Sequence, residues 1–489
     1  MNRAYPDRVR YNGGGHGNDI RNMRAIIHDF IHYNRNMQPD LGKLLRSGLS
    51  TRQFEILQQV AAEASSKALP IFVVGGLLRD LVLGRPVSDF DVVVEGDAIR
   101  LARTLSAKLG GQVASHPRFG TAKWTLAPSR LSLADAVAEL RGDHVSLDHI
   151  DLISARSEEY LRPGDLPDVK PGGIDDDLRR RDFTINTLAV RLDGLHFGEV
   201  HDPFGALTDL EQGIVRTMHA QSFRHDPTRM FRAVRYQERY GFKIAPETRA
   251  LLAEARPHVR DLSAHRIRQE LDRILGEDRA ALMISRLSKL DLLAPIHQAL
   301  PADRAALRRL KVAAHPVYAS GPTPSNEFRW IVWLIELSMA DLRSINRRLH
   351  FRKKVLEDLL AASRLHREAA SFAHWKPSRI TAHLQGISPL AISAVQASAA
   401  KQRTREILAD YLDTWRHLKP STTGRDLKRM GLEPGPAYRQ ILGELHREWL
   451  DGGIRSQAEE LARLESLLRQ HGWTASRGTV QHAAHKLTN

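Results

Sequence analysis

Residues 71–97 read IFVVGGLLRDLVLGRPVSDFDVVVEGD, and the rest of the chain is organised around this stretch. Its apolar start predicts a β-strand, which the paired glycines Gly75 and Gly76 end before a short helix. A second apolar run carries Asp89 and Asp91. Because alternate residues of a strand point to the same face, we expect both carboxylates on one side of one strand. Two neighbouring anions repel each other unless a cation lies between them, and hard divalent cations with oxygen ligands suit that position.

The paired glycines allow the backbone to approach a phosphate group closely, and the helix start presents amide groups that can receive it. A glycine turn followed by Asp-x-Asp on the next strand therefore predicts a metal-dependent nucleotidyl-transfer site. The alternative is a hairpin that carries two surface aspartates, because Asp-x-Asp alone is a weak pattern.

The complete arrangement, G-G-x-x-R-D-x-x-L-G followed by D-x-D, is far more specific than either part. It resembles the nucleotidyltransferase superfamily that includes DNA polymerase beta. More narrowly, it is similar to the class II tRNA nucleotidyltransferases (CCA-adding enzymes) and the bacterial poly(A) polymerases. The resemblance covers residues 70–275 and, less closely, residues 420–465. It implies an α+β fold, with a mixed-sheet nucleotidyltransferase head followed by all-helical neck, body and tail domains.

The composition favours a polyanionic partner. The 489 residues contain 72 Lys and Arg against 57 Asp and Glu, which gives a formal net charge of +15. A surplus of this size favours nucleic acid before membrane as the partner, although a basic soluble protein without such a partner is the alternative. The length suffices for about three domains.

Several classes of protein are disfavoured by the same sequence. It contains no cysteine, which excludes disulfides and thiolate metal sites. No apolar run approaches the ~20 residues that span a bilayer. The N-terminus lacks the apolar core of a secretory signal. We therefore expect a cytoplasmic protein that does not interact with a membrane, and no feature of the sequence indicates an oligomeric state.

A third carboxylate, Asp151, lies within the apolar run HIDLISA at residues 149–155. A carboxylate inside an apolar strand is costly to bury without a partner, so we expect it beside Asp89 and Asp91. An exposed position on an edge strand is the alternative. The resemblance implies a two-metal Mg²⁺ site in which Asp89 and Asp91 bind the ions and Asp151 assists.

Residues 180–186, RRDFTIN, match the second motif of the family, and they place Arg181 where the family contacts nucleotide. The resemblance implies that Gly75, Gly76 and Arg79 hold the triphosphate together with Arg181. An isolated arginine triplet would otherwise indicate a solvated face.

Two weaker candidates for RNA binding are Arg118, in the turn HPRFG, and Lys123 on the strand that follows. Arg118 could meet a triphosphate or the 3′ end of an RNA. A turn arginine is more often simply solvated.

Residues 223–240, FRHDPTRMFRAVRYQERY, repeat Asp226, Arg229, Arg232 and Arg235 at intervals of three, which predicts one broad helix face. An ion-paired exposed helix is the alternative. A carboxylate and a guanidinium together can select C and A, since both bases carry an exocyclic amine beside a ring-nitrogen acceptor. Uracil and guanine present a carbonyl beside an N–H and would leave these groups unpaired.

The resemblance implies that Asp226 and Arg229 read the incoming base and that Arg232 and Arg235 support the nucleotide. The commonest form of this motif has Glu before the Asp, where this chain has His225. We expect His225 to buttress the base-reading pair.

The remaining patterns define the expected domains. Residues 51–65 and 98–109 are predicted helices, residues 112–115 and 121–126 are predicted strands, and residues 156–173 are a predicted loop rich in Pro and Gly. Residues 1–20 are expected to be disordered, and residues 128–149 to form a helical insertion. We expect an N-terminal extension (1–50), head (51–217), neck (218–280), body (281–418) and tRNA-binding tail (419–489).

The predicted function is template-independent addition of C, A or both to the 3′ end of tRNA, with CTP and ATP as substrates and pyrophosphate as product. Poly(A) polymerase is the alternative within the same chemistry. A catalytically silent RNA-binding relative is the alternative from another class, but the intact Asp89, Asp91, Asp226 and Arg229 disfavour it.

Overall fold

The structure is a computed structural model that describes residues 40–87, 89–127, 147–160, 167–314 and 325–470. The predicted disordered leader, the predicted insertion and the last residues of the chain lie outside this description. The chain divides into two compact units, Met1–Ser263 and Ala264–Asn489. This division falls within the expected neck (residues 218–280), and the finer domain limits stay predictions.

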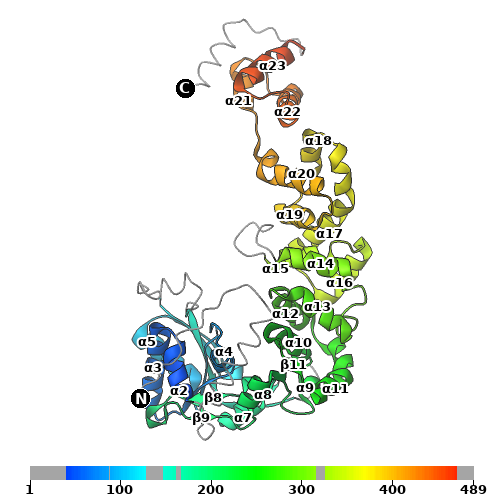
Figure 1. Ribbon diagram of the computed structural model, residues 1–489. Helices are drawn as coiled ribbons and strands as arrows, with labels where there is room; N and C mark the ends of the chain where they lie inside the picture. The colour runs from blue at the N-terminus through cyan, green and yellow to red at the C-terminus, as the bar shows by residue number, and fades with distance from the viewer. Residues whose placement is uncertain (1–39, 88, 128–146, 161–166, 315–324, 471–489) are drawn as a thin grey trace, which may run out of the picture. The chain divides into compact units, whose positions relative to one another are not determined.

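The first unit is built on a seven-stranded sheet with the order β3-β4-β5-β2-β1-β8-β9 (Figure 1). Its pairings are antiparallel except for β2 with β5, which run parallel. The sheet is therefore mixed, and the α+β prediction is confirmed. Its strands are β1 (Ile71–Val74), β2 (Asp91–Val94), β3 (Gln112–His116), β4 (Thr121–Thr125), β5 (His149–Ser154), β8 (Ala189–Arg191) and β9 (Val200–His201).

Helices cover this sheet where the apolar spacing of the sequence places them. Helix α5 (Ala98–Leu109) contacts β3, β4 and β5, and α3 (Thr51–Ser65) packs against α5. Ser50 caps α3 in a capping box with Gln53. These elements agree with the predicted helices and strands. The other α-helices among the described residues of this unit are α2 (Leu41–Gly48), α4 (Gly76–Val82), α7 (Ile174–Arg179), α8 (Ala206–Gln212), α9 (Ser222–His225), α10 (Thr228–Tyr240) and α11 (Pro246–Ala255), with a small sheet of β10 (Ile214–Val215) and β11 (Lys243–Ile244).

The predicted loop at residues 156–173 is wrong in part. It contains an antiparallel pair, β6 (Arg156–Glu159) and β7 (Asp168–Pro171). The Pro and Gly residues end and flank these strands, whereas the strands themselves are held by cross-strand pairing that local composition does not reveal.

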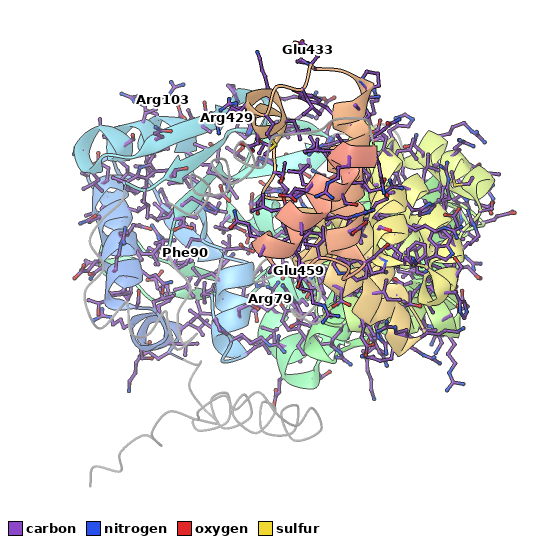
Figure 2. The ribbon with its side chains drawn as sticks, turned by 90° about the horizontal axis from the view of Figure 1, so that it is seen from above. Arg79, Phe90, Arg103, Arg429, Glu433 and Glu459 are labelled. Atoms are coloured by element: carbon purple, nitrogen blue, oxygen red, sulfur yellow. The ribbon has the colours of Figure 1, made fainter. Side chains whose placement is uncertain are left out.

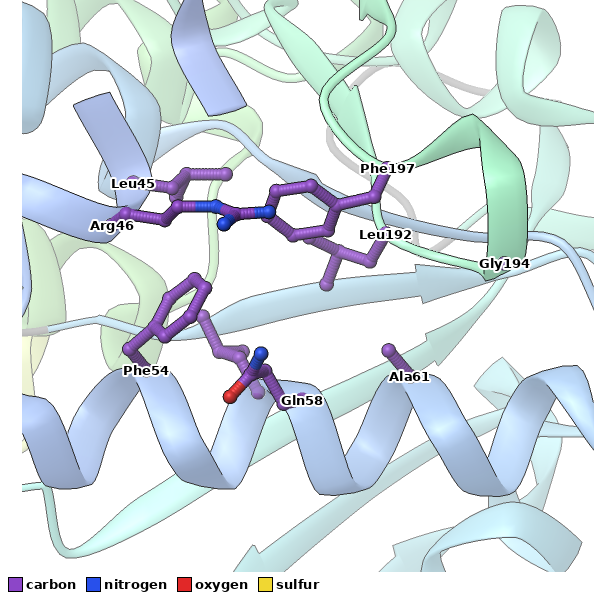
Figure 3. A pocket seen from close by; sticks show the side chains of 9 residues that line it. Leu45, Arg46, Phe54, Gln58, Ala61, Leu192, Gly194 and Phe197 are labelled. Atoms are coloured by element: carbon purple, nitrogen blue, oxygen red, sulfur yellow. The ribbon is translucent and has the colours of Figure 1, made fainter. Parts of the chain in front are cut away.

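A pocket on the first unit lies between α2, α3 and the residues that follow β8 (Figure 3). The ring centroids of Phe54 and Phe197 are 6.1 Å apart there, and the Arg46 guanidinium lies 4.9 Å from the Phe197 ring. None of the predicted site residues lines this pocket. Its lining is formed by Leu45, Arg46, Phe54, Leu57, Gln58, Ala61, Leu192, Gly194 and Phe197.

The second unit is helical wherever the structure describes it. No helix among the described residues is long and apolar enough to cross a membrane. Its helices are α12 (Ala264–Leu275), α13 (Ala280–Lys289), α14 (Arg304–Ala313), α15 (Asn326–Leu334), α16 (Met339–Leu349), α17 (Lys353–Glu368), α18 (Pro377–Leu384), α19 (Pro389–Ser398), α20 (Gln402–Asp413), α21 (Gly424–Arg429), α22 (Pro436–Leu450) and α23 (Gln457–Gln470).

The last three helices share a hydrophobic core and a buried carboxylate. Glu460 on α23 accepts hydrogen bonds from the Ser421 and Thr422 amides, at 2.9 and 2.6 Å, and from the Trp449 indole at 2.7 Å. Burial alone would raise the pKa of Glu460, but these hydrogen bonds lower it. Glu460 therefore links residues 421–422, which precede α21, to α22 and α23.

We expect Glu460→Ala to lower the local unfolding free energy of residues 421–470 by about 3 kcal/mol, because one buried and two partly buried donors lose their acceptor. Amide hydrogen exchange of this segment measures the change. Glu465→Ala is the matched control on the same helix, since Glu465 makes an exposed 3.4 Å ion pair with Arg469 worth less than about 1 kcal/mol. Equal effects of the two substitutions would contradict the assignment.

Candidate active site

The three predicted carboxylates converge at the start of β2. The parallel register sets Asp91 directly beside Asp151 of β5, and the Asp151 amide donates to the Phe90 carbonyl at 2.9 Å. Asp89 is exposed and precedes the strand, so its predicted place on the strand is wrong. Its charge nevertheless acts on Asp91. The predicted position of Asp151 beside Asp91 is thus confirmed, and the parallel pairing of β2 with β5 produces it.

The electrostatics of Asp91 suit a cation. Its pKa is raised, first by burial and then by the nearby negative charges of Asp151, Asp89 and Asp177, while the Arg181 guanidinium acts in the opposite direction. A cation placed among these carboxylates would relieve the repulsion, and carboxylate oxygens are the ligands that Mg²⁺ prefers. As they stand, the side chains described here form no group of three or more His, Asp or Glu residues close enough to enclose a metal ion.

Asp151 has partners of its own in this arrangement. Lys123 Nζ lies 3.3 Å and His149 Nε2 lies 3.7 Å from its Oδ2. Lys123 therefore faces the carboxylates, while Arg118 lies 4.0 Å from Asp168 of β7. The predicted contacts of Lys123 and Arg118 with RNA stay predictions.

Gly75 and Arg181 approach each other closely. Gly75 has a φ of +71°, and a Cβ atom added to it would lie 2.6 Å from Arg181 Nη1. Arg181 Nη2 donates to Asp177 Oδ2 at 3.0 Å, and Nη1 donates to the Asn186 carbonyl at 3.4 Å. A glycine is thus required here both for its backbone conformation and for space.

Arg79 is held from several sides. Its guanidinium donates twice to Asp80, at 3.0 and 2.9 Å, and once to the Asn186 side chain at 2.7 Å. It also lies 5.2 and 5.0 Å from the Tyr236 and Tyr240 rings of α10. Figure 2 labels Arg79, which lies on α4, and Phe90, which directly precedes β2. Both residues belong to the first unit. The guanidinium is buried, so it ties α4 to α10 here, and its role in triphosphate binding stays a prediction.

The predicted single helix over residues 223–240 is interrupted. Helix α9 ends at His225, Asp226 has an extended backbone, and α10 begins at Thr228 after Pro227. Asp226 Oδ1 accepts from the Thr228 amide at 2.9 Å and from its hydroxyl at 2.6 Å. The predicted shared helix face is therefore wrong for Asp226, because Pro227 starts a new helix instead of continuing the first.

The arginines of α10 reach back to the second motif. Arg229 Nη2 donates to the Arg180 carbonyl at 2.7 Å, and Nη1 donates to the Ser222 hydroxyl at 2.8 Å. Arg232 Nε donates to Asp182 at 2.6 Å. Burial would raise the pKa of Asp182, but Arg232 and the Asn186 amide lower it to about 2.

Arg235 completes the predicted set. It is buried on α10, with its guanidinium 5.5 Å from the centre of the Tyr236 ring. Every predicted site residue lies in the first unit.

Sequence reasoning missed Glu158 and Tyr160, which lie in the segment predicted as a loop, and it did not single out Asp177. Asp177 is fully buried and pairs with both Arg180 and Arg181. The acidic run before an arginine triplet was the available signal for these pairs. No local signal pointed to Glu158 or Tyr160.

Two family models match the chain. The poly A polymerase head domain matches residues 71–216, and the probable RNA and SrmB-binding site of polymerase A matches residues 241–303. A CCA-adding enzyme from Pseudomonas putida is 31% identical over 288 residues, which are 57% of this chain and 68% of that protein.

The chain belongs to the tRNA nucleotidyltransferase and poly(A) polymerase family. An A-adding tRNA nucleotidyltransferase of Geobacter sulfurreducens is 32% identical over 83% of this chain, although the match spans only 46% of that longer protein. The A-adding tRNA nucleotidyltransferase of Halalkalibacterium halodurans is 27% identical over 86% of this chain and 93% of its own length.

Solved structures agree with this family. A CCA-adding enzyme in its apo form II matches with a TM-score of 0.71 at 26% identity, over 87% of this chain and 98% of the other. The Thermotoga maritima CCA-adding enzyme complexed with tRNA matches with a TM-score of 0.67 at 25% identity, over 88% and 98%.

We expect Gly75→Ala to weaken the binding of a nucleoside triphosphate about tenfold, the value of one charge-assisted contact, because the new Cβ would displace Arg181. Titration calorimetry with ATP measures the affinity. Gly194→Ala is the matched control, because Gly194 has a φ of +52° but no atom within 4 Å of an added Cβ. Both variants should lose stability, and only Gly75→Ala should lose affinity. Equal affinities would contradict the close contact.

We expect a pH-dependent stability that traces to His219. Burial, Arg229 and His225 lower the pKa of His219 from 6.5 to about 4. Between pH 6.5 and pH 4 the unfolded chain binds a proton at His219 and the folded chain does not. The free energy of unfolding is therefore at its full value above pH 6.5 and falls as the pH drops toward 4. The loss should be about 2 kcal/mol, allowing for partial exposure, and His219→Gln should remove it. Urea unfolding at pH 7 and pH 5 tests this, and identical pH dependences in both proteins would contradict it.

Proposed function

We propose that this chain adds nucleotides to the 3′ end of tRNA without a nucleic-acid template, using ATP or CTP and releasing pyrophosphate. The observation that carries the proposal is the desolvated position of Asp91 beside Asp151, within the field of Asp89. The segment of Asp226 and Arg229, the family membership and the +15 charge support it.

Each residue of the site would have a separate role in the reaction. Asp89 and Asp91 would hold Mg²⁺, with Asp151 assisting. When bound, Mg²⁺ supplies a lower pKa for the attacking 3′-hydroxyl and charge stabilisation for in-line displacement at the α-phosphate. Arg181, placed by Asp177 against the Gly75 turn, is positioned to neutralise triphosphate charge.

The incoming base would be read by Asp226 and Arg229. Asp226 Oδ1 accepts from the Thr228 amide and hydroxyl, which orients the carboxylate that would accept from the exocyclic amine. Arg229 uses two N–H donors on Ser222 and Arg180, and a guanidinium has five. Arg232 and Arg235 would support the nucleotide from α10.

Among the possible products, we favour addition of the terminal A. The A-adding relatives of Geobacter sulfurreducens and Halalkalibacterium halodurans match the chain over more than four fifths of its length. The base-reading pair accepts both C and A in principle, so synthesis of the whole CCA end is the second candidate. Poly(A) synthesis is the third, since the head-domain model carries that name.

Extension of three tRNA transcripts, ending before CCA, after C and after CC, tests the proposal. Each is offered ATP, CTP or both, with Mg²⁺. We expect a single A on the CC end. Ordered addition of CCA would establish a complete CCA-adding enzyme, and long A tails a poly(A) polymerase. No extension of any transcript would overturn the proposal.

We expect Asp89→Ala to reduce incorporation by at least about a thousandfold without weakening tRNA binding, because the charge stabilisation at the reacting phosphate is lost. Single-turnover extension and tRNA filter binding measure the two quantities. Asp97→Ser is the control, because it removes a carboxylate of the same stretch while it retains the cap that Asp97 provides to α5. Persistent activity of Asp89→Ala would refute the metal assignment.

A further inference from the structure

Glu158, at the end of the β6–β7 pair, gathers several donors. Its Oε1 accepts from Arg156, at 3.2 and 2.9 Å, and from Arg180 Nη1 at 3.1 Å. Its Oε2 accepts from the Tyr160 hydroxyl at 2.8 Å. The Glu158 side chain is only 7% exposed. A buried carboxylate with this many donors fixes the positions of the groups around it.

Tyr160 makes a second contact through its ring. It stacks on the His225 ring with a centroid distance of 5.0 Å and an interplanar angle of 14°. His219 packs against His225 at 5.1 Å and 50°. Burial and Arg229 lower the pKa of His225, so its imidazole is neutral at pH 7 and the stack carries no desolvated charge.

This stack lies next to the base-reading pair. His225 is the last residue of α9, and Asp226 follows it directly. Asp226 lies between α9 and α10, where its amide donates to the Ser222 carbonyl at 3.1 Å and its carbonyl accepts from the Arg229 amide at 3.0 Å. These bonds fix the backbone. The ring of His225 is a side-chain anchor immediately before it.

The same carboxylate also reaches the other member of the pair. Glu158 holds the Arg180 guanidinium, and the Arg180 carbonyl accepts from Arg229 Nη2 at 2.7 Å. Glu158 is thus connected to Asp226 through Tyr160 and His225, and to Arg229 through Arg180. Glu158 and Tyr160, which lie in the segment predicted to be a loop, are therefore connected to both Asp226 and Arg229.

We propose that Tyr160, held by Glu158, is a positioning residue that sets nucleotide affinity and selectivity through its stack on His225. This inference rests on the proposed function. In this role Tyr160 acts through His225. Recognition by two directional hydrogen bonds depends on their placement to within a fraction of an ångström, so a looser Asp226 should cost affinity and discrimination before it costs chemistry.

The test compares Tyr160→Leu, which removes the ring, with Tyr160→Phe, which keeps the stack but loses the hydroxyl. With ATP on a CC-ended tRNA, we expect Tyr160→Leu to raise the nucleotide KM about five- to tenfold, in line with the loss of one aromatic pair. Its kcat should stay within about threefold of wild type, and the preference for ATP over GTP should fall by about the same factor as the affinity. Tyr160→Phe keeps the ring but loses the hydrogen bond to Glu158 that holds it, so its KM and selectivity should fall between those of wild type and Tyr160→Leu.

Two further variants separate positioning from general packing. Phe54→Leu removes a ring of the Phe54–Phe197 pair, outside the site, and should leave KM and selectivity unchanged. The double variant Tyr160→Leu/His225→Leu should lose no more than the worse single variant if both residues act through one stack.

The outcomes distinguish the two levels of inference. An inactive wild-type protein would overturn the proposed function. An active wild type with unchanged KM and selectivity in Tyr160→Leu would overturn the positioning role alone. A fall in kcat that follows a lower melting temperature, at constant KM and selectivity, would also overturn it, because it would show a merely structural residue.

Discussion

Like charges held side by side at the edge of the sheet are the constraint on which this site depends. The parallel pairing of β2 with β5 puts Asp91 against Asp151, and burial raises the pKa of Asp91 while the Asp151 side chain stays 36% exposed. A carboxylate at such a place is costly unless positive charge lies nearby. The surrounding guanidiniums and a lysine offset the repulsion in part, and a divalent cation would complete the neutralisation.

Each of the arginines around the site contacts more than one neighbour. Arg180 joins Glu158 to Asp177, and Arg181 joins Asp177 to the glycine turn. Arg232 joins α10 to Asp182. Such pairs are favourable when each guanidinium meets well-placed acceptors, and they are costly when one partner is lost. The network therefore fixes the mutual positions of the second motif, the β6–β7 pair and the start of α10.

Asp226, which we propose reads the incoming base, lies in the break between α9 and α10. Its amide donates to the Ser222 carbonyl and its carbonyl accepts from the Arg229 amide, so the backbone is held on both sides of the break. Its position is determined by Thr228 on one side and by the aromatic stack of His225 on the other.

The sequence by itself determined the glycine turn, the apolar strands, the capped helix α3, helix α5 and the family, because these depend on local spacing and residue type. It also identified Asp89 and Asp91 from their spacing on one apolar run, led us to expect Asp151 beside them, and gave Arg181 and Asp226 through the family resemblance. The tertiary structure confirmed that Asp151 lies beside Asp91. Only the tertiary structure decided the register of that pairing, the burial of Arg79 near the Tyr236 and Tyr240 rings, and the pairing of Arg156–Glu159 with Asp168–Pro171. These features arise from pairing between segments distant in the chain. The register of two strands and the partner of a buried charge are properties of the folded core, which local periodicity does not encode.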